Sequence, residues 1–272
     1  MLPTEATLAC ERIEIAAWRD YYEAVPSAAR DALGVSVHAV GEGVALVART
    51  IESLLANRII GLGLGLAASE ASIDEALAHY RGVAGGFAVN LSPRAMPESI
   101  PLWLESRGLA TFFHHLPHGR AAGSPPDSGS SLFVREVEPE SAAVWSHVAM
   151  AETEDATSPH QFAWHEACVG RAGWTQVLAM QGESAVAAAT MFMQGDAAWL
   201  GHARTLSSHR RMGAQRALLA ARIRIATHRG AKWLATETGP DWPDVARESL
   251  RNVRWAGFAP LHERPSWIPI PG

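Results

Sequence analysis

The chain has 272 residues, a length that is comfortable for two compact domains. With 48% hydrophobic and 19% charged residues, its composition is typical of a globular protein and excludes a disordered or collagen-like chain. The formal net charge of −5, with a pI near 6.2, has the opposite sign from a global nucleic-acid footprint. We therefore expect no nucleic-acid partner.

The compartment is predicted from three features of the chain. No run of about 18 apolar residues occurs, so no membrane span is expected. The first residues carry acids and lack the charged-then-apolar pattern of a secretory signal. Two cysteines, Cys10 and Cys168, cannot staple a chain of this size, so the sequence predicts a cytoplasmic protein.

The first part of the chain alternates helical and extended patterns. Apolar spacing predicts helices over 18–24, 46–56, 73–80 and 97–107, and strands over 59–67 and 86–92. The glycine-rich run 59–67 partly fits a dinucleotide fingerprint. The acid expected about 20 residues further on is missing, because none lies between Glu75 and Glu98. Close packing of a glycine-rich strand is the better interpretation.

A seam of linker composition lies near the middle of the chain. Residues 118–131 hold three glycines, two adjacent prolines and four serines, without apolar periodicity. We therefore predict an N-terminal domain over 1–122, a linker over 123–131 and a C-terminal domain over 132–272.

The second part predicts a mixed sheet. Strands are expected over 132–137, 175–181, 185–194, 197–205, 233–238 and within 258–267, and helices over 140–150, 160–170, 210–228 and 248–256. This order mixes hairpins with crossovers. It predicts an α/β (α+β) fold whose mixed, twisted sheet is flanked by helices on both faces.

The join between strand 197–205 and the helix predicted from Arg210 carries the strongest chemical signal. A helix start exposes unpaired N–H donors and a partial positive charge, and Gly213 would let a ligand approach the backbone closely. Arg210, Arg211 and Arg216 add formal charge, which favours a phosphate or diphosphate. Residues 204–229 hold seven arginines and no acid, a pattern that fits either a solvated face or an anion site.

The run Arg210-Arg211-Met212-Gly213-Ala214-Gln215 resembles the signature Q/R-x-x-G-x-G/A of the GNAT superfamily of N-acetyltransferases. Two later runs strengthen the resemblance: 230–234 resembles the family's entry into the next strand, and 251–258 its short helix ending in Gly-Phe. The resemblance spans about residues 132–267 and implies a GNAT-like acyl-CoA N-acyltransferase fold.

This resemblance implies acetyl-CoA as cosubstrate and no metal. By motif position, the coenzyme's diphosphate would lie on the backbone of the helix start, and its pantetheine arm would pair with the end of the preceding strand. Asn252 would donate a hydrogen bond to the coenzyme. The implied cofactor-binding residues are Ala203, Thr205, Arg210, Arg211, Met212, Gly213, Ala214, Gln215, Arg216 and Asn252. By period-two alternation, Ala203 and Thr205 would share one strand face and His202 would lie on the other.

The catalytic residues are less fully specified. Where the family often has a tyrosine that protonates the leaving thiolate, this chain has Val253, so Ser249 and His262 are candidate substitutes. Glu237, near the end of strand 233–238, is the candidate to accept a proton through water or to hold a cationic amine. A helix-cap hydroxyl, a surface imidazole and a solvent-facing strand-end carboxylate are the alternative interpretations. Three acids, Glu152, Glu154 and Asp155, would favour a cationic acceptor if their loop roofs its pocket.

These features predict transfer of an acetyl group from acetyl-CoA to an amine by direct attack. The partner would be a small-molecule or peptide amine, with the acceptor and the oligomeric state left open. The order of elements in the first half echoes a GNAT unit without its signature, which predicts a degenerate GNAT-like domain. The alternative is a non-catalytic CoA-sensing or partner-binding module, favoured by Val253 and by Gln215, which stands where the signature has Gly or Ala.

Overall fold

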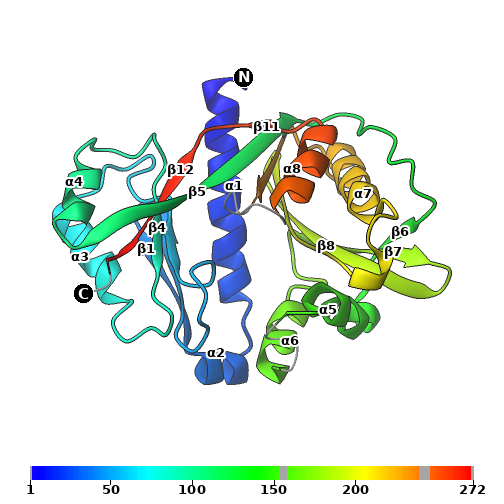
Figure 1. Ribbon diagram of the computed structural model, residues 1–272, viewed down its shortest axis with the longest axis horizontal. Coiled ribbons are helices and arrows are strands. Elements are labelled where there is room, and N and C mark those ends of the chain that lie inside the picture. Colours follow the sequence, from blue (N-terminus) through cyan, green and yellow to red (C-terminus); the bar gives the residue numbers. More distant parts are fainter. Residues whose placement is uncertain (1, 154–157, 239–245, 271–272) are drawn as a thin grey trace.

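The computed structural model describes residues 2–153, 158–238 and 246–270 (Figure 1). The N-terminal half contains α1 (Thr4–Glu23), α2 (Ser27–Leu33), β1 (Val35–Val40), β2 (Gly43–Ala48), β3 (Arg58–Ile60), α3 (Glu70–Ala78), β4 (Ala88–Asn90), α4 (Ile100–Glu105) and β5 (Leu109–Ala121). The C-terminal half contains β6 (Phe133–Glu136), a 3-10 turn η1 (Pro139–Ser141), α5 (Ala142–Met150), α6 (Pro159–Glu166), β7 (Trp174–Gln181), β8 (Ser184–Gln194), β9 (Ala197–Thr205), a 3-10 turn η2 (Ser207–His209), α7 (Ala214–His228), β10 (Trp233–Thr238), α8 (Ala246–Trp255), β11 (Ala259–Pro260) and β12 (Arg264–Pro269).

The two halves repeat one order of elements. In the first, two helices precede three strands, and then helix, strand, helix and strand follow, from α1 to β5. After β6, the second half runs through the same succession from α5 to β12. Each half also has one parallel pair, β3 with β4 and β9 with β10, on either side of a crossover helix. The expected mixed sheet is therefore confirmed, and the repeat is more complete than the sequence indicated.

The halves exchange their last strands. The strands form one sheet in the order β1-β2-β3-β4-β12-β5-β10-β9-β8-β7-β6. Strand β12 of the C-terminal half therefore lies between β4 and β5, while β5 also pairs with β10 of the other half. Residues 118–121 of the predicted seam belong to β5, so the unpaired linker begins later than composition suggested. The division into two domains joined by a linker over 123–131 stays a prediction. The exchange of strands β5 and β12 between the halves was not predicted.

Helix α1 is packed between the halves. It contacts β1 and β2 of the N-terminal half together with β9 and β10 of the C-terminal half, and Figure 1 shows it (blue) along the middle of the molecule. Its Trp18 belongs to an apolar cluster that includes Leu46 from β2 and Trp199 from β9. The core is therefore shared, which ties the position of each half to the other. No helix in the described part of the chain is both long and apolar enough to cross a bilayer.

Two predictions for the N-terminal half are wrong. The helix predicted over 46–56 begins instead inside β2, whose six residues are all buried. A strand covered on both faces is apolar throughout, and its sequence does not separate it from a buried helix. The strand predicted over 59–67 ends at Ile60, because Gly61 takes a φ of 75° that turns the chain out of the sheet.

Candidate functional site

Strands β9 and β10 separate into a fork, which we define as the space between them beyond their last paired residues. Parallel pairing runs from Trp233 with Ala197 to Ala235 with Trp199 and then stops, although both strands continue. The hydroxyl of Thr236 donates to the carbonyl of Leu200 at 2.8 Å, so a side chain takes the place of the ladder where the strands part. β10 stays paired with β5 on its other side, whereas beyond Trp199 the edge of β9 that faces β10 has no ladder partner among the described residues.

A β-bulge lies on β9 inside the fork. Ala188 pairs with Arg204 and Thr190 with Gly201, so two residues of β9, His202 and Ala203, stand opposite Ala189 alone. His202 has a φ of 43°, a conformation that is strained for a residue with a side chain. Such bulges re-aim groups of the strand and are frequent beside active sites. The bulge also breaks the period-two alternation that was predicted across Ala203 and Thr205.

The helix start differs in detail from its prediction. Arg210 is extended, Arg211 has a φ of 65°, and Gly213 is the N-cap with a φ of 78°, so α7 begins at Ala214 and not at Arg210. Only a glycine adopts the left-handed conformation at the cap without strain. Among the described residues, no side chain caps this helix, and the amides of 214–216 donate no hydrogen bond. These amides are the donors that an anion would use.

Side chains connect the helix start with the strand and with α8. Gln215 donates through Nε2 to Oγ1 of Thr205 at 3.0 Å, so its side chain reaches the end of β9. Arg216 donates through Nε to Oδ1 of Asn252 at 3.3 Å and lies over the ring of Trp255, 5.0 Å from its centroid. The structure therefore brings together the predicted residues from the strand, the loop and α8.

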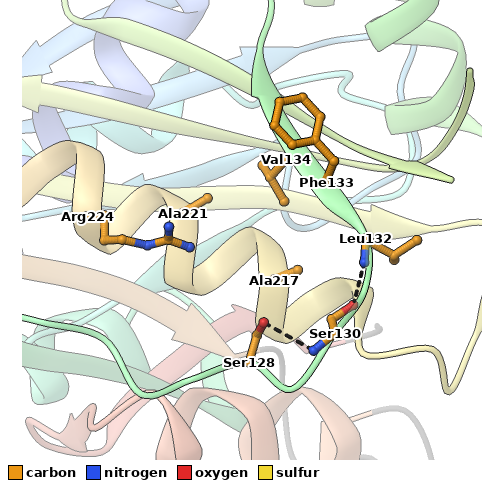
Figure 2. Close-up of a pocket in the computed structure, with 8 residues that line it drawn as sticks. All are labelled: Ser128, Ser130, Leu132, Phe133, Val134, Ala217, Ala221 and Arg224. Atoms are coloured by element: carbon orange, nitrogen blue, oxygen red, sulfur yellow. Dashed lines mark hydrogen bonds between the residues drawn. The ribbon is translucent and has the colours of Figure 1, made fainter. Parts of the chain in front are cut away.

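The linker borders the same loop. Ser130 donates through its hydroxyl to the carbonyl of Met212 at 3.0 Å, and a Cβ at Gly213 would lie 3.1 Å from that of Ser130. Figure 2 shows Ser128 and Ser130 alongside α7, where they border a shallow pocket with Ala217 and Ala221 of the helix. The linker thus fixes the loop on one side, and a side chain at 213 would meet it.

Glu237 is part of a buried ion-pair network. Its carboxylate oxygens lie 3.1 Å from Nη2 of Arg58 and 2.9 Å from Nη2 of Arg264. Arg264 also makes two hydrogen bonds to Glu14, of 3.0 and 2.7 Å. Burial alone would raise the pKa of Glu237, but nearby positive charges, led by that of Arg58, outweigh it and hold the pKa below its ordinary value. Glu237 is therefore a poor proton acceptor at neutral pH.

The other two catalytic candidates lie apart. Ser249 is exposed on α8, while Val253 on the same helix is buried. His262 follows β11 and lies 3.9 Å from the carboxylate of Glu11, and burial lowers its pKa to about 4. Neither contacts Glu237 through a hydrogen bond or ion pair of the described residues. Over the described ranges, no group of three His, Cys, Asp or Glu side chains could hold a metal ion.

The acids predicted to roof the acceptor pocket are only partly described. Glu154 and Asp155 lie outside the described residues. Glu152 accepts a hydrogen bond from the amide of Ser207 at 2.8 Å and pairs with Arg210 at 3.4 Å. The side chain of Ser207, and after it the amide, lower the pKa of Glu152, so the side chain is an anion beside the predicted diphosphate loop.

Sequence reasoning missed the aromatic wall that α1 adds to the fork. The hydroxyl of Tyr21 lies 3.0 Å from Nδ1 of His165, and its ring lies 5.0 Å from that of His202. Trp18 packs against His202 at 5.2 Å. Burial and the neighbouring His165 lower the pKa of His202 to about 3, so its imidazole is neutral. Since α1 precedes β9 by about 180 residues, only the tertiary fold brings these groups together.

Comparison with known proteins agrees with this geometry. No protein-family model and no curated protein matches the sequence. Among solved structures, a GCN5-related N-acetyltransferase from Kribbella flavida superposes with a TM-score of 0.63, covering 100% of this chain and 98% of that chain at 17% identity. This is the fold of the GNAT N-acetyltransferases.

Two further structures share this fold. A GCN5-related N-acetyltransferase from Sphaerobacter thermophilus has a TM-score of 0.55 over 85% of this chain and 81% of that one, at 13% identity. A tandem GNAT protein from the clavulanic acid biosynthesis pathway has a TM-score of 0.51 over 75% and 69%, at 14% identity. The resemblance inferred from the signature is thus confirmed as a likeness of fold.

Proposed function

We propose that this protein is an acyl-CoA-dependent N-acetyltransferase, which transfers an acetyl group from acetyl-CoA to an amine. The observation that carries the proposal is the adjacency of the fork between β9 and β10 to the uncapped start of α7. An open strand edge and unpaired helix amides, side by side, suit a ligand with an extended amide-containing arm and a diphosphate. The likeness of fold supports the same assignment.

The residues present fit acetyl-CoA. Amides 214–216 and the side chains of Arg210 and Arg211 would hold the diphosphate, at a helix start where Gly213 takes the left-handed N-cap conformation. The edge of β9 at Ala203 and Thr205 would pair with the amides of the pantetheine arm. Asn252 accepts a hydrogen bond from Arg216 beside these groups, which supports its proposed hydrogen bond to the coenzyme.

When bound, acetyl-CoA supplies an activated thioester. In the proposed reaction the amine nitrogen forms a bond to the carbonyl carbon, the carbon–sulfur bond breaks, and the sulfur keeps the electron pair. Backbone N–H groups at the β9 bulge would polarise the carbonyl oxygen, a role that the bulge in the fork supports. The amine loses one proton and the thiolate gains one, so the step needs no other reactant.

Three residues are considered for the transfer of the proton. Arg58 and Arg264 hold Glu237 in its anionic form. We therefore propose that Glu237 keeps a negative charge beside the fork and does not accept the proton of the amine. Ser249 and His262 are retained as candidates to protonate the thiolate. For the acceptor we propose a small-molecule or peptide amine, and for its compartment the cytoplasm.

We further propose that the N-terminal half is a degenerate GNAT-like unit. Its β3, glycine loop and α3 occupy the place in the repeat of β9, the arginine loop and α7. Protein atoms close this loop: Leu62 and Leu64 are buried, and Gly63 accepts a hydrogen bond from the amide of Met96 at 2.9 Å. A Cβ at Gly65 would clash with the carboxylate of Glu42, and the negative charge of this carboxylate disfavours an anion at the same place.

A non-catalytic CoA-binding module is the second candidate. Two residues favour it: Val253 stands where the family resemblance implies a proton donor, and the ion pairs of Glu237 make the candidate proton acceptor unsuitable. Both functions require coenzyme binding, so turnover distinguishes them.

The test combines binding with turnover. Calorimetric titration with acetyl-CoA measures binding, and release of the CoA thiol is then followed with a panel that includes a polyamine, an aminoglycoside, an amino-acid amide and a peptide. Binding with thiol release and an acetylated product supports the enzyme. Binding without release from any amine supports the second candidate, and the absence of binding contradicts both.

A further inference from the structure

One arginine of the seven in the run 204–229 is fully buried. Arg222, on the third turn of α7, is 1% exposed, whereas Arg210, Arg211 and Arg224 are exposed. Within the described residues, no carboxylate lies within ion-pair distance of it. A buried charge without an opposite charge beside it is strongly destabilising, so the position of Arg222 needs a physical explanation.

The partners of Arg222 are backbone carbonyls at the bulge. Nη1 donates to the carbonyl of Thr190 at 2.8 Å and to that of Gly201 at 3.2 Å, and Nε donates to Leu218 of its own helix at 3.2 Å. Thr190 and Gly201 form the last regular pair before the bulge. One planar guanidinium therefore joins α7 to both strands at the point where their ladder is interrupted.

Neighbouring carbonyls are held by side chains as well. Trp145 donates through its indole to Ala189, the residue opposite the bulge, at 3.2 Å. Thr236 donates to Leu200, immediately before Gly201. Four carbonyls around the bulge, those of Ala189, Thr190, Leu200 and Gly201, thus accept hydrogen bonds from side chains, which fixes a strained backbone at His202.

We propose that Arg222 is a positioning residue for the proposed acetyl transfer: its guanidinium holds the β9 bulge in the geometry that presents backbone N–H groups to the thioester carbonyl. This inference rests on the proposed function. The buried positive charge also lies on the carbonyl side of the same peptide groups, where it strengthens their N–H dipoles toward a developing oxyanion. Burial lowers the pKa of Arg222 to about 9, so the side chain stays cationic at neutral pH.

The test follows the carbonyl of bound acetyl-CoA. Carbon-13 NMR of acetyl-CoA labelled at the acetyl carbonyl reports polarisation as a downfield shift on binding, and calorimetry with unlabelled CoA reports affinity separately. The variants are Arg222→Gln and Arg222→Lys, with Arg224→Gln as the matched control, since Arg224 is an exposed arginine on the same helix. Circular dichroism establishes that each variant is folded.

We expect the wild type and Arg224→Gln to show the full downfield shift. Arg222→Gln should bind CoA nearly as well and lose most of that shift. Arg222→Lys should lose part of it, because lysine keeps a cationic donor but has no counterpart of the Nε that fixes the side chain to Leu218. If Arg222→Gln does not fold, Arg222→Lys decides. An unchanged shift in a folded Arg222 variant, or no shift in wild type that binds, overturns the inference. Failure of the wild type to bind acetyl-CoA overturns the proposed function, and this inference with it.

Discussion

Replacement of Arg264 by methionine tests how the two halves are held together. Arg264 is 3% exposed, lies on the exchanged strand β12, and binds Glu14 of α1 and Glu237 of β10. Methionine keeps much of the volume of the side chain and removes its charge. Two carboxylates then stay buried, with Arg58 as the remaining cation in contact with Glu237.

Removing one partner of a buried ion pair costs about 3–5 kcal/mol, because the remaining charge has no compensation. We expect Arg264→Met to lower the free energy of unfolding by about this amount. Arg12→Met is the control, since Arg12 pairs with Glu42 at 3.0 Å with half-exposed side chains, a kind of pair that contributes about 0–1 kcal/mol. Adding Glu14→Gln to Arg264→Met removes one of the uncompensated charges, so part of the stability should return.

Urea unfolding followed by circular dichroism measures each free energy, at pH 7.5 and at pH 5.5. Burial already raises the pKa of Glu14, and loss of Arg264 raises it further, so the folded variant holds a proton that the unfolded chain releases. Stability of this kind is present at low pH and is lost as the pH rises through the folded-state pKa. The deficit of Arg264→Met relative to wild type should therefore shrink at pH 5.5. A loss no larger than that of Arg12→Met would refute the reasoning.

Three further outcomes follow from the structure. Burial lowers the pKa of His115 to about 4, so the free energy of unfolding should fall by up to about 1.4 kcal/mol per pH unit as the pH drops from 6.5 to 4. His115→Gln should reduce this pH dependence in urea unfolding, and an unchanged dependence would contradict the assignment. Because the last strands are exchanged, fragments 1–122 and 132–272 should each be misfolded alone and should assemble when co-expressed, as judged by gel filtration; a folded isolated fragment would argue against the shared sheet. Asn252→Ala should weaken CoA binding by roughly 1 kcal/mol, about fivefold in Kd by calorimetry, and unchanged affinity would remove Asn252 from the site.

The C-terminal half was largely predictable because its signals are local. Strands β9 and β10 match their predicted bounds, since turn residues and polar ends mark both sides of each. The signature around Gly213 located the helix start to within four residues. The offset arises because Arg210 and Arg211 have helix-compatible side chains but take backbone conformations set by the loop.

Features that depend on distant contacts could not be predicted. The bulge at His202 requires donors from α5, α7 and β10, and no pattern within β9 indicates it. Similarly, the sequence around Glu237 predicts an ordinary carboxylate at the end of a strand. Its low pKa is caused by Arg58 on β3 and Arg264 on β12, which are distant in the sequence. The apolar periodicity of the sequence does not indicate the strand exchange, because β5 and β12 would be strands whether each paired within its own half or with the other half.

Binding of CoA at the start of α7 is the central claim, and Gly213→Glu tests it most directly. At a CoA concentration of 100 times Kd, binding stabilises the folded state by about 2.7 kcal/mol, which raises the melting temperature by roughly 5 °C for a chain of this size. Gly182→Glu is the matched control, since Gly182 also has a positive φ, of 59°, and no atom lies within 4 Å of its Cβ position. We predict the full rise in wild type and Gly182→Glu and none in folded Gly213→Glu, because a side chain at this left-handed N-cap strains the helix start and adds a negative charge next to the amides that would hold the diphosphate. A full rise in Gly213→Glu would contradict the account.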